Sequence, residues 1–74
     1  MPVRVIPVGF LRDRFSQGEL VLDAAGQTVT EILTHLAVPP DLVGVVLVNG
    51  RQVSKDTALQ DGDEVKLVPF VGGG

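Results

Sequence analysis

The C-terminal end of the chain carries the group best suited to chemistry, because three successive glycines, Gly72, Gly73 and Gly74, lead to a terminal carboxylate. An α-carboxyl group is ionised at neutral pH and can act as a nucleophile, but it is a poor acyl donor without activation. Glycine has no side chain, so such a tail can thread a narrow channel. The stretch from Phe70 to Gly74 spans roughly 17 Å when extended, at about 3.3–3.6 Å per residue, which carries the carboxylate clear of a small globular body.

Apolar residues come directly before the glycines, in the order Pro69, Phe70 and Val71. Exposed apolar side chains beside a flexible tail are typical of contacts with a protein partner. We therefore predict that these three residues contact a partner at the mouth of a slot, and that Gly72 and Gly73 thread into it. Taken alone, the glycines are more typical of a frayed chain end or an added segment, and the sequence around them is what favours a reactive tail.

Other side chains with chemical potential are few. His35 is the only histidine and cysteine is absent, so neither a His/Cys metal site nor a His-based catalytic triad can be assembled, and we predict no metal. We expect His35 at the boundary between a helix and solvent. Asp61, Asp63 and Glu64 form an acidic cluster with two open interpretations, a carboxylate patch for a basic partner near the tail or ordinary turn chemistry on a solvated face.

Composition restricts the class of protein. The chain has 74 residues, a formal net charge of −3 and 45% hydrophobic residues, which indicates one small domain with an aliphatic core. The absence of cysteine excludes disulfides, and six basic residues make nucleic acid a poor candidate partner. No apolar run approaches the roughly 18 residues that span a bilayer, and no signal peptide is evident, so we expect no membrane partner and a cytoplasmic location.

Two strands are predicted in the first part of the chain. Residues 3–8 are rich in β-branched side chains, with Pro7 at the end of the strand or on a sheet edge. Residues 9–18 are predicted to be a connection from which one or two side chains enter the core. The aliphatic segment 20–22 then returns antiparallel to the first strand.

A helix follows, and its start is marked by Thr28 with Glu31 three residues later, which is a capping box. Pro39 disfavours helical angles at Val38, so the helix should end near Ala37. Its apolar residues recur with a period of about 3.6 and form one stripe, namely Val29, Ile32, Leu33, Leu36 and Ala37.

The second half of the chain predicts three more strands. The continuous apolar run 44–48 is typical of a strand buried on both faces. Asn49 and Gly50 favour a type I′ turn into a short strand over residues 51–53. Residues 64–68 alternate between polar and apolar as in a half-exposed final strand, and Pro69 ends its hydrogen bonding because it lacks an N–H group.

The order of elements predicts an α+β fold in which one main helix covers one face of a mixed sheet of four to five strands. This is the β-grasp, or ubiquitin-like, arrangement. We assign residues 1–71 to this domain and residues 72–74 to a flexible Gly-Gly-Gly tail.

The sequence resembles the ubiquitin-like sulfur carriers of the MoaD and ThiS family over nearly its whole length. The resemblance is densest over residues 61–74, which are similar to the family's Asp-Gly-Asp turn, last strand and diglycine terminus. Residues 25–29 and 48–50 are similar to the thiamine branch, whereas Pro69 and the long first connection with Arg12 and Arg14 are similar to the molybdopterin branch. Phe70 stands where the molybdopterin branch often has a second proline, so the branch stays open.

The resemblance implies a role as a protein co-substrate rather than an enzyme. A ubiquitin-activating-type enzyme would use ATP to adenylate Gly74, and a sulfur donor protein would convert the adenylate to a thiocarboxylate. A biosynthetic synthase subunit would then receive the sulfur for molybdopterin or thiamine synthesis. The chain itself would bind no cofactor, since ATP is used by the activating partner.

Two alternatives compete with this interpretation. The first is a ubiquitin-like modifier that becomes amide-linked to lysines of other proteins through the same activated Gly74. The second is a β-grasp interaction module with an inert tail. An independent enzyme is the least favoured reading, because the sequence offers no recognisable catalytic set.

Overall fold

A computed structural model describes residues 2–15 and 18–70, and these contain one five-stranded sheet. The strands are β1 (Val3–Pro7), β2 (Leu20–Leu22), β3 (Val43–Val48), β4 (Arg51–Val53) and β5 (Glu64–Pro69). Their order across the sheet is β2-β1-β5-β3-β4, so the last strand of the chain lies in the centre. β1 and β5 pair in parallel and the other neighbours pair antiparallel, which confirms a mixed sheet.

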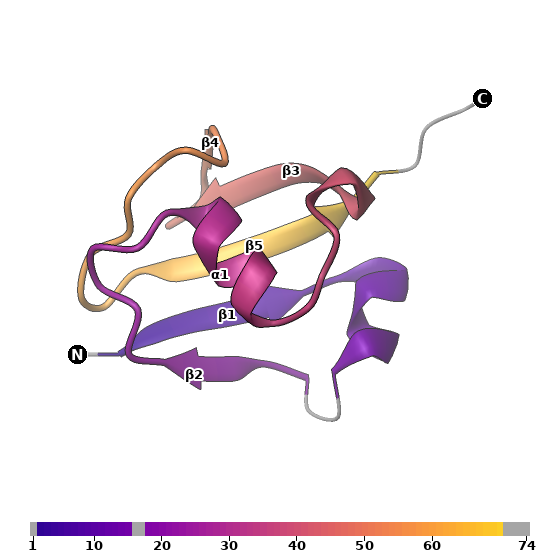
Figure 1. The fold of residues 1–74 in the computed structure, drawn as a ribbon, viewed down its shortest axis with the longest axis horizontal. Coiled ribbons are helices and arrows are strands. Elements are labelled where there is room, and N and C mark those ends of the chain that lie inside the picture. The colour runs from indigo at the N-terminus through magenta and orange to yellow at the C-terminus, as the bar shows by residue number, and fades with distance from the viewer. Residues whose placement is uncertain (1, 16–17, 71–74) are drawn as a thin grey trace.

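One α-helix, α1 (Val29–His35), lies across one face of this sheet (Figure 1). Two short 3₁₀ helices, η1 (Gly9–Arg14) and η2 (Pro40–Leu42), connect the strands. The structure thus has the predicted β-grasp architecture, in which the sheet and the helix each bury one apolar face against the other. The buried core comprises Val3, Val5, Leu11, Ala24, Val29, Ile32, Leu33, Val38, Val43, Val46, Leu59, Val65 and Leu67.

The first connection, from which one or two side chains were predicted to enter the core, supplies Leu11. Leu11 is fully buried and Phe15 packs partly against the core. η1 therefore covers one end of the sheet with an apolar side chain, although its other residues are mostly exposed.

The helix begins as predicted and ends slightly earlier. The Thr28 side chain accepts a hydrogen bond from the Glu31 backbone N–H, and the Glu31 carboxylate accepts one from the Thr28 backbone N–H. At the other end Ala37 has a positive φ of 60°, and the N–H groups of Ala37 and Val38 donate to the carbonyls of Thr34 and Leu33. This is a Schellman motif, which turns Val38 into the core and leaves Ala37 exposed.

The prediction that residues 44–48 are buried on both faces is wrong. In β3, Val46 is buried under the helix, whereas Val45 and Leu47, which point to the opposite face, are only half-buried. The physical reason is that α1 covers one face of the sheet only, so the outward residues of β3 keep contact with solvent. We call the face opposite α1 the open face.

No helix within residues 2–15 and 18–70 is long and apolar enough to cross a membrane.

Candidate functional site

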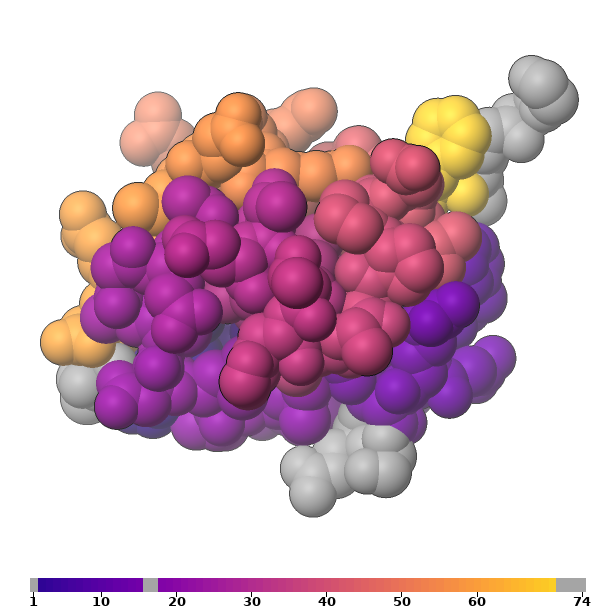
Figure 2. Space-filling view, viewed as in Figure 1, coloured from indigo at the N-terminus to yellow at the C-terminus, as the bar shows by residue number. Residues whose placement is uncertain are grey.

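The candidate site begins where β5 leaves the sheet. β5 is the central strand and ends at Pro69, and Phe70 follows it with its side chain 62% exposed. The yellow residues at this end of the strand project from the body in Figure 2. We call Pro69 and Phe70 the tail root, because residues 71–74 continue from them.

The predicted contact and tail residues have different positions in this structure. Phe70 is exposed, as expected for a partner contact, whereas Pro69 is buried beside Gly9, so its ring packs within the fold. Val71, Gly72, Gly73 and Gly74, the residue predicted to react, lie outside the described residues. Their roles in partner binding, threading and activation stay predictions.

Backbone contacts hold the tail root on two sides. The Phe70 N–H donates a hydrogen bond of 2.7 Å to the carbonyl of Leu42 at the end of η2. Pairing along β5 therefore continues one residue beyond Pro69, which the sequence predicted to end it. A Cβ atom built on Gly44 would lie 3.0 Å from the Phe70 Cα, and one built on Gly9 would lie 2.8 Å from the Pro69 Cγ. Both glycines therefore allow a close approach to the tail root.

A second exposed aromatic residue lies next to this position. Phe10 directly follows Gly9 and is 47% exposed. A Cβ atom added to Gly9 would lie 2.8 Å from the Pro69 Cγ, so the segments that carry Phe10 and Phe70 approach each other at one corner of the molecule. Sequence reasoning did not single out Phe10, since an aromatic residue in a glycine-bounded connection is equally typical of a core contact.

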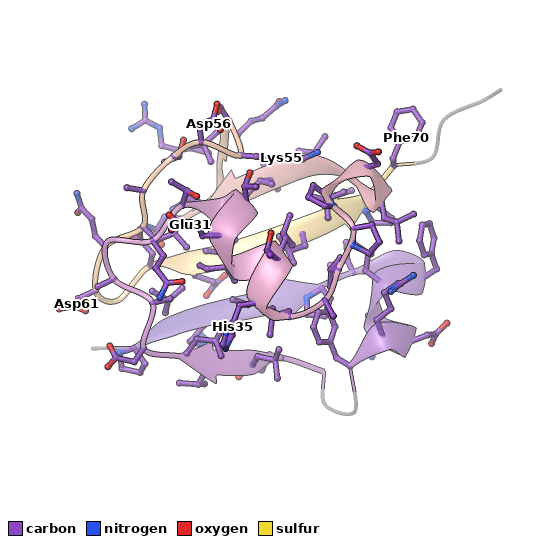
Figure 3. All side chains as sticks on the ribbon, viewed as in Figure 1. Glu31, His35, Lys55, Asp56, Asp61 and Phe70 are labelled. Carbon is purple, nitrogen blue, oxygen red and sulfur yellow. The ribbon has the colours of Figure 1, made fainter. Side chains whose placement is uncertain are left out.

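The acidic cluster lies at the other end of β5, which contradicts its predicted location near the tail. Asp61 and Phe70 occupy opposite ends of the view in Figure 3. The separation follows from strand geometry, because the seven residues from Asp63 to Phe70 extend over roughly 23 Å. A partner surface that receives the tail root is therefore well separated from this cluster.

Hydrogen bonds within the cluster support its interpretation as turn chemistry. The Asp63 carboxylate accepts from the Asn49 side-chain amide at 2.9 Å and from the Gln60 backbone N–H at 2.9 Å. Glu64 donates its backbone N–H to the Asn49 side-chain oxygen and accepts from the Arg4 guanidinium through its carboxylate. These contacts fasten the β3–β4 turn to the start of β5.

Charged groups on the open face pair with one another at the same end. The Arg4 guanidinium lies 2.8 Å from the Glu19 carboxylate and 3.2 Å from that of Glu64. The hydrogen bond and negative charge of Glu19 raise the pKa of Arg4, which stays protonated in any case. Such exposed pairs contribute little to stability. They lie at one end of the open face, and the apolar residues of this face lie nearer the tail root.

His35 is exposed at the end of α1, as predicted for a boundary residue. It lines a shallow depression with Gln27, Thr30, Glu31 and Thr34. One oxygen of the Glu31 carboxylate accepts the capping-box hydrogen bond from the Thr28 N–H. Within the described part of the chain, no three His, Asp or Glu side chains come together as a metal site requires.

The fold and the exposed end of β5 define a small ubiquitin-like protein of the β-grasp class. The sequence model of the ThiS family matches residues 8–74, which is most of the chain. The chain therefore belongs to the ThiS family. The search among curated proteins gave no match.

Solved structures support the same assignment. A Pyrococcus furiosus protein assigned as molybdopterin converting factor subunit 1 is 26% identical, with a TM-score of 0.75 over 95% of this chain and 98% of that one. Small archaeal modifier protein 1 from Methanosarcina acetivorans is 26% identical, with a TM-score of 0.73 over 99% and 96%. Subunit 1 in a complex of molybdopterin-converting factor subunits from Helicobacter pylori is 25% identical, with a TM-score of 0.64 over the whole of both chains.

Proposed function

We propose that this protein is a sulfur carrier that works through Gly74. A ubiquitin-activating-type enzyme adenylates the Gly74 carboxylate, and a sulfur donor protein converts the adenylate to a thiocarboxylate. The thiocarboxylate then gives its sulfur to a precursor, held by a synthase, in the synthesis of molybdopterin or thiamine. In this scheme the chain is a co-substrate and binds no cofactor of its own.

The observation that carries the proposal is the position of the tail root. The central strand of the sheet ends at Pro69, and Phe70 is 62% exposed at the point where the glycine tail begins. A strand held on both sides makes a rigid base, so the position of Phe70 is well defined relative to the rest of the fold. A glycine tail on such a base can be inserted into a partner while the body docks outside it.

The chemistry requires a partner at every step. Attack of a Gly74 carboxylate oxygen on the α-phosphorus of ATP forms the acyl-adenylate and releases pyrophosphate. A sulfide-level nucleophile (HS⁻) released by the donor protein then attacks the acyl carbon and displaces AMP, which leaves the thiocarboxylate and one proton. The described residues bury no polar or charged side chain, so the proposal gives this domain no acid or base of its own.

A synthase subunit is the proposed final partner. The Helicobacter pylori neighbour was solved in complex with subunit 2 of its molybdopterin-converting factor. In this chain Phe10, Phe70 and the half-buried Val45 and Val68 of the open face supply apolar surface close to the tail root. We propose that this surface contacts the synthase and the activating enzyme in turn.

The test is the intact mass of the protein recovered from its native cells during active cofactor synthesis. We expect a species in which one oxygen is replaced by sulfur, and its loss when Gly74 is deleted. Recovery of the free carboxylate alone, under conditions where the cofactor is being made, would contradict a carrier role.

A second candidate function is protein modification, which is favoured by the likeness to the archaeal modifier protein. In this case a lysine amine attacks the acyl carbon of the adenylated Gly74, displaces AMP and forms an amide. The expected observation is a set of higher-mass conjugates that survive thiols and disappear when Gly74 is deleted. If both the sulfur-containing species and the conjugates are missing, the alternative of an interaction module with an inert tail is left.

A further inference from the structure

Gly44 occupies an unusual place for a glycine. It lies inside β3 within a run of valines, where glycine costs about 0.5–1 kcal/mol relative to alanine. It is not among the residues with positive φ, so its backbone angles do not demand glycine. The reason must therefore be space around the missing side chain.

The register of the sheet shows what fills that space. Val43 pairs with Pro69, and Val45 pairs with Val68. The two partners on β5 are consecutive residues, so Gly44, which lies between Val43 and Val45, is an extra residue in β3. This β-bulge brings the Gly44 Cα against the tail root, where an added Cβ would meet the Phe70 Cα at 3.0 Å and its backbone nitrogen at 3.3 Å. Bulges commonly redirect a strand next to a functional position.

Two other groups complete the contact around the tail root. The Leu42 carbonyl accepts the Phe70 N–H at 2.7 Å on the same side as the bulge. From the η1 side, Gly9 approaches the Pro69 ring, with 2.8 Å between its ideal Cβ position and the Cγ of Pro69. Three segments far apart in the sequence thus meet where the described part of β5 ends.

We propose that Gly44, assisted by Gly9, is a positioning residue for activation of the C-terminus. It allows β3 to approach Phe70 closely, and this approach sets the place and direction from which the tail enters the activating enzyme. The proposal rests on the function proposed above. It concerns placement of the tail and assigns no contact between Gly44 and ATP or the reacting atoms.

The test compares Gly44→Ala with Gly18→Ala as adenylation substrates of the ubiquitin-activating-type enzyme from the same genome. Gly18 is a matched control because an added Cβ there meets nothing within 4 Å and its φ is not positive. ATP–pyrophosphate exchange measured over a range of carrier concentrations gives kcat and KM for each variant. Circular dichroism and hydrogen exchange of the Phe70 amide report on the fold and on the tail root.

We expect folded Gly44→Ala to lower kcat by about tenfold or more while KM stays within about twofold, because small misplacements of a reacting group cost large factors in rate. A loss of stability alone would not produce this split between kcat and KM. Gly18→Ala should match the wild type in both. A folded Gly44→Ala with the kcat of the control overturns the proposal.

The experiment also covers a variant that does not fold and a wild-type chain that supports no exchange. If Gly44→Ala does not fold, Gly9→Ala takes its place with the same expected loss of kcat, because its added Cβ would lie 2.8 Å from the Pro69 Cγ. Gly9 also has a positive φ of 60°, so its control is Gly26→Ala, which has a φ of 87° and nothing within 4 Å of an added Cβ. Failure of both variants to fold overturns the proposal, since the glycines would then serve the fold and not tail placement. A wild-type chain that supports no exchange overturns the proposed function itself.

Discussion

At the scale of single residues, the end of α1 is the clearest strained position. Ala37 holds φ at 60° in the C′ position of the Schellman motif, where glycine is usual because it has no Cβ to clash with the backbone. The motif forms nevertheless, because it satisfies two helix carbonyls and directs Val38 into the core.

Gly at this position should therefore stabilise the protein. We expect Ala37→Gly to raise the free energy of unfolding by about 0.5–1 kcal/mol, since relief of the left-handed strain exceeds the added entropy of the unfolded chain. Urea denaturation measures the change. Ala25→Gly is the control, because Ala25 is exposed without a positive φ and should gain nothing. Equal effects of the two substitutions would show that Ala37 is not strained.

Phe70 is the residue for which exposure itself suggests a role. An exposed aromatic side chain beside a tail that enters a partner is a candidate hot spot. We expect Phe70→Ala to weaken binding to the activating enzyme about 30-fold, while the free energy of unfolding changes by less than about 0.5 kcal/mol. Calorimetric titration and urea denaturation measure the two quantities.

Val21→Ala is the matched control for this prediction. Val21 is similarly exposed, at 57%. It lies on the edge strand β2, where it pairs with Arg4 of β1, away from the tail root. Its removal should leave binding unchanged. Similar losses for both variants would mean that apolar surface in general, and not the tail root, determines binding.

At the scale of elements, the β3–β4 turn is built to fix the start of β5. Asn49 has a φ of 52° and Gly50 a φ of 85°, as the type I′ turn requires. The Asn49 side chain also bonds Asp63 and Glu64, and its backbone N–H donates to the Glu64 carbonyl. One residue therefore combines turn geometry with a link between two segments.

Two substitutions separate these contributions. We expect Asn49→Ala to lower the free energy of unfolding by about 2–3 kcal/mol, because it loses two hydrogen bonds and strains a residue with positive φ. Asn49→Gly should cost about 1 kcal/mol less, since it loses the hydrogen bonds and relieves the strain. Thermal and urea unfolding provide the comparison. An equal cost for the two would show that backbone strain does not contribute.

At the scale of the whole molecule, different kinds of residue lie at the two ends of the central strand β5. Charged groups and hydrogen bonds are concentrated at the Asp61–Gly62 turn. There the Arg4 N–H donates to the Asp63 carbonyl. The opposite end gathers Phe10, Phe70 and the two glycines that approach the tail root. Because β1 and β5 run parallel, the first residues of the chain lie beside the acidic turn and far from Phe70.

This polarity predicts how the protein tolerates fusions. A tag before Pro2 should leave sulfur transfer intact, because β1 starts at the end remote from the tail root. A tag after Gly74 should abolish it, because the proposed mechanism needs a free carboxylate to attack ATP and the fusion converts this group to an amide. Complementation of cofactor synthesis by the two fusions measures this. Equal activity of both fusions would refute a reactive C-terminus.

Much of the local structure could be read from the sequence. The capping box at Thr28 and Glu31, the Asn49-Gly50 turn and the five strand segments all depend on residues close together in the chain, so their patterns predicted them. Phe70 was likewise predicted as an exposed contact from its place after the last strand. The ionised carboxylate of Gly74 follows from covalent structure. Its adenylation and conversion to a thiocarboxylate were implied by the family resemblance and stay predictions.

The order of the strands and the exposure of their faces depend on pairing between segments that are distant in the sequence, so only the tertiary structure determines them. An alternating pattern does not say that β5 is the central strand or that β3 is open on one face. Gly44 shows the reason most clearly. The lack of a side chain at this position is explained by the fold, which places the Phe70 Cα 3.0 Å from the ideal Cβ position of Gly44. Local backbone and side-chain preferences act between neighbours in the chain, whereas sheet order and close backbone approach arise from packing residues that the sequence holds far apart.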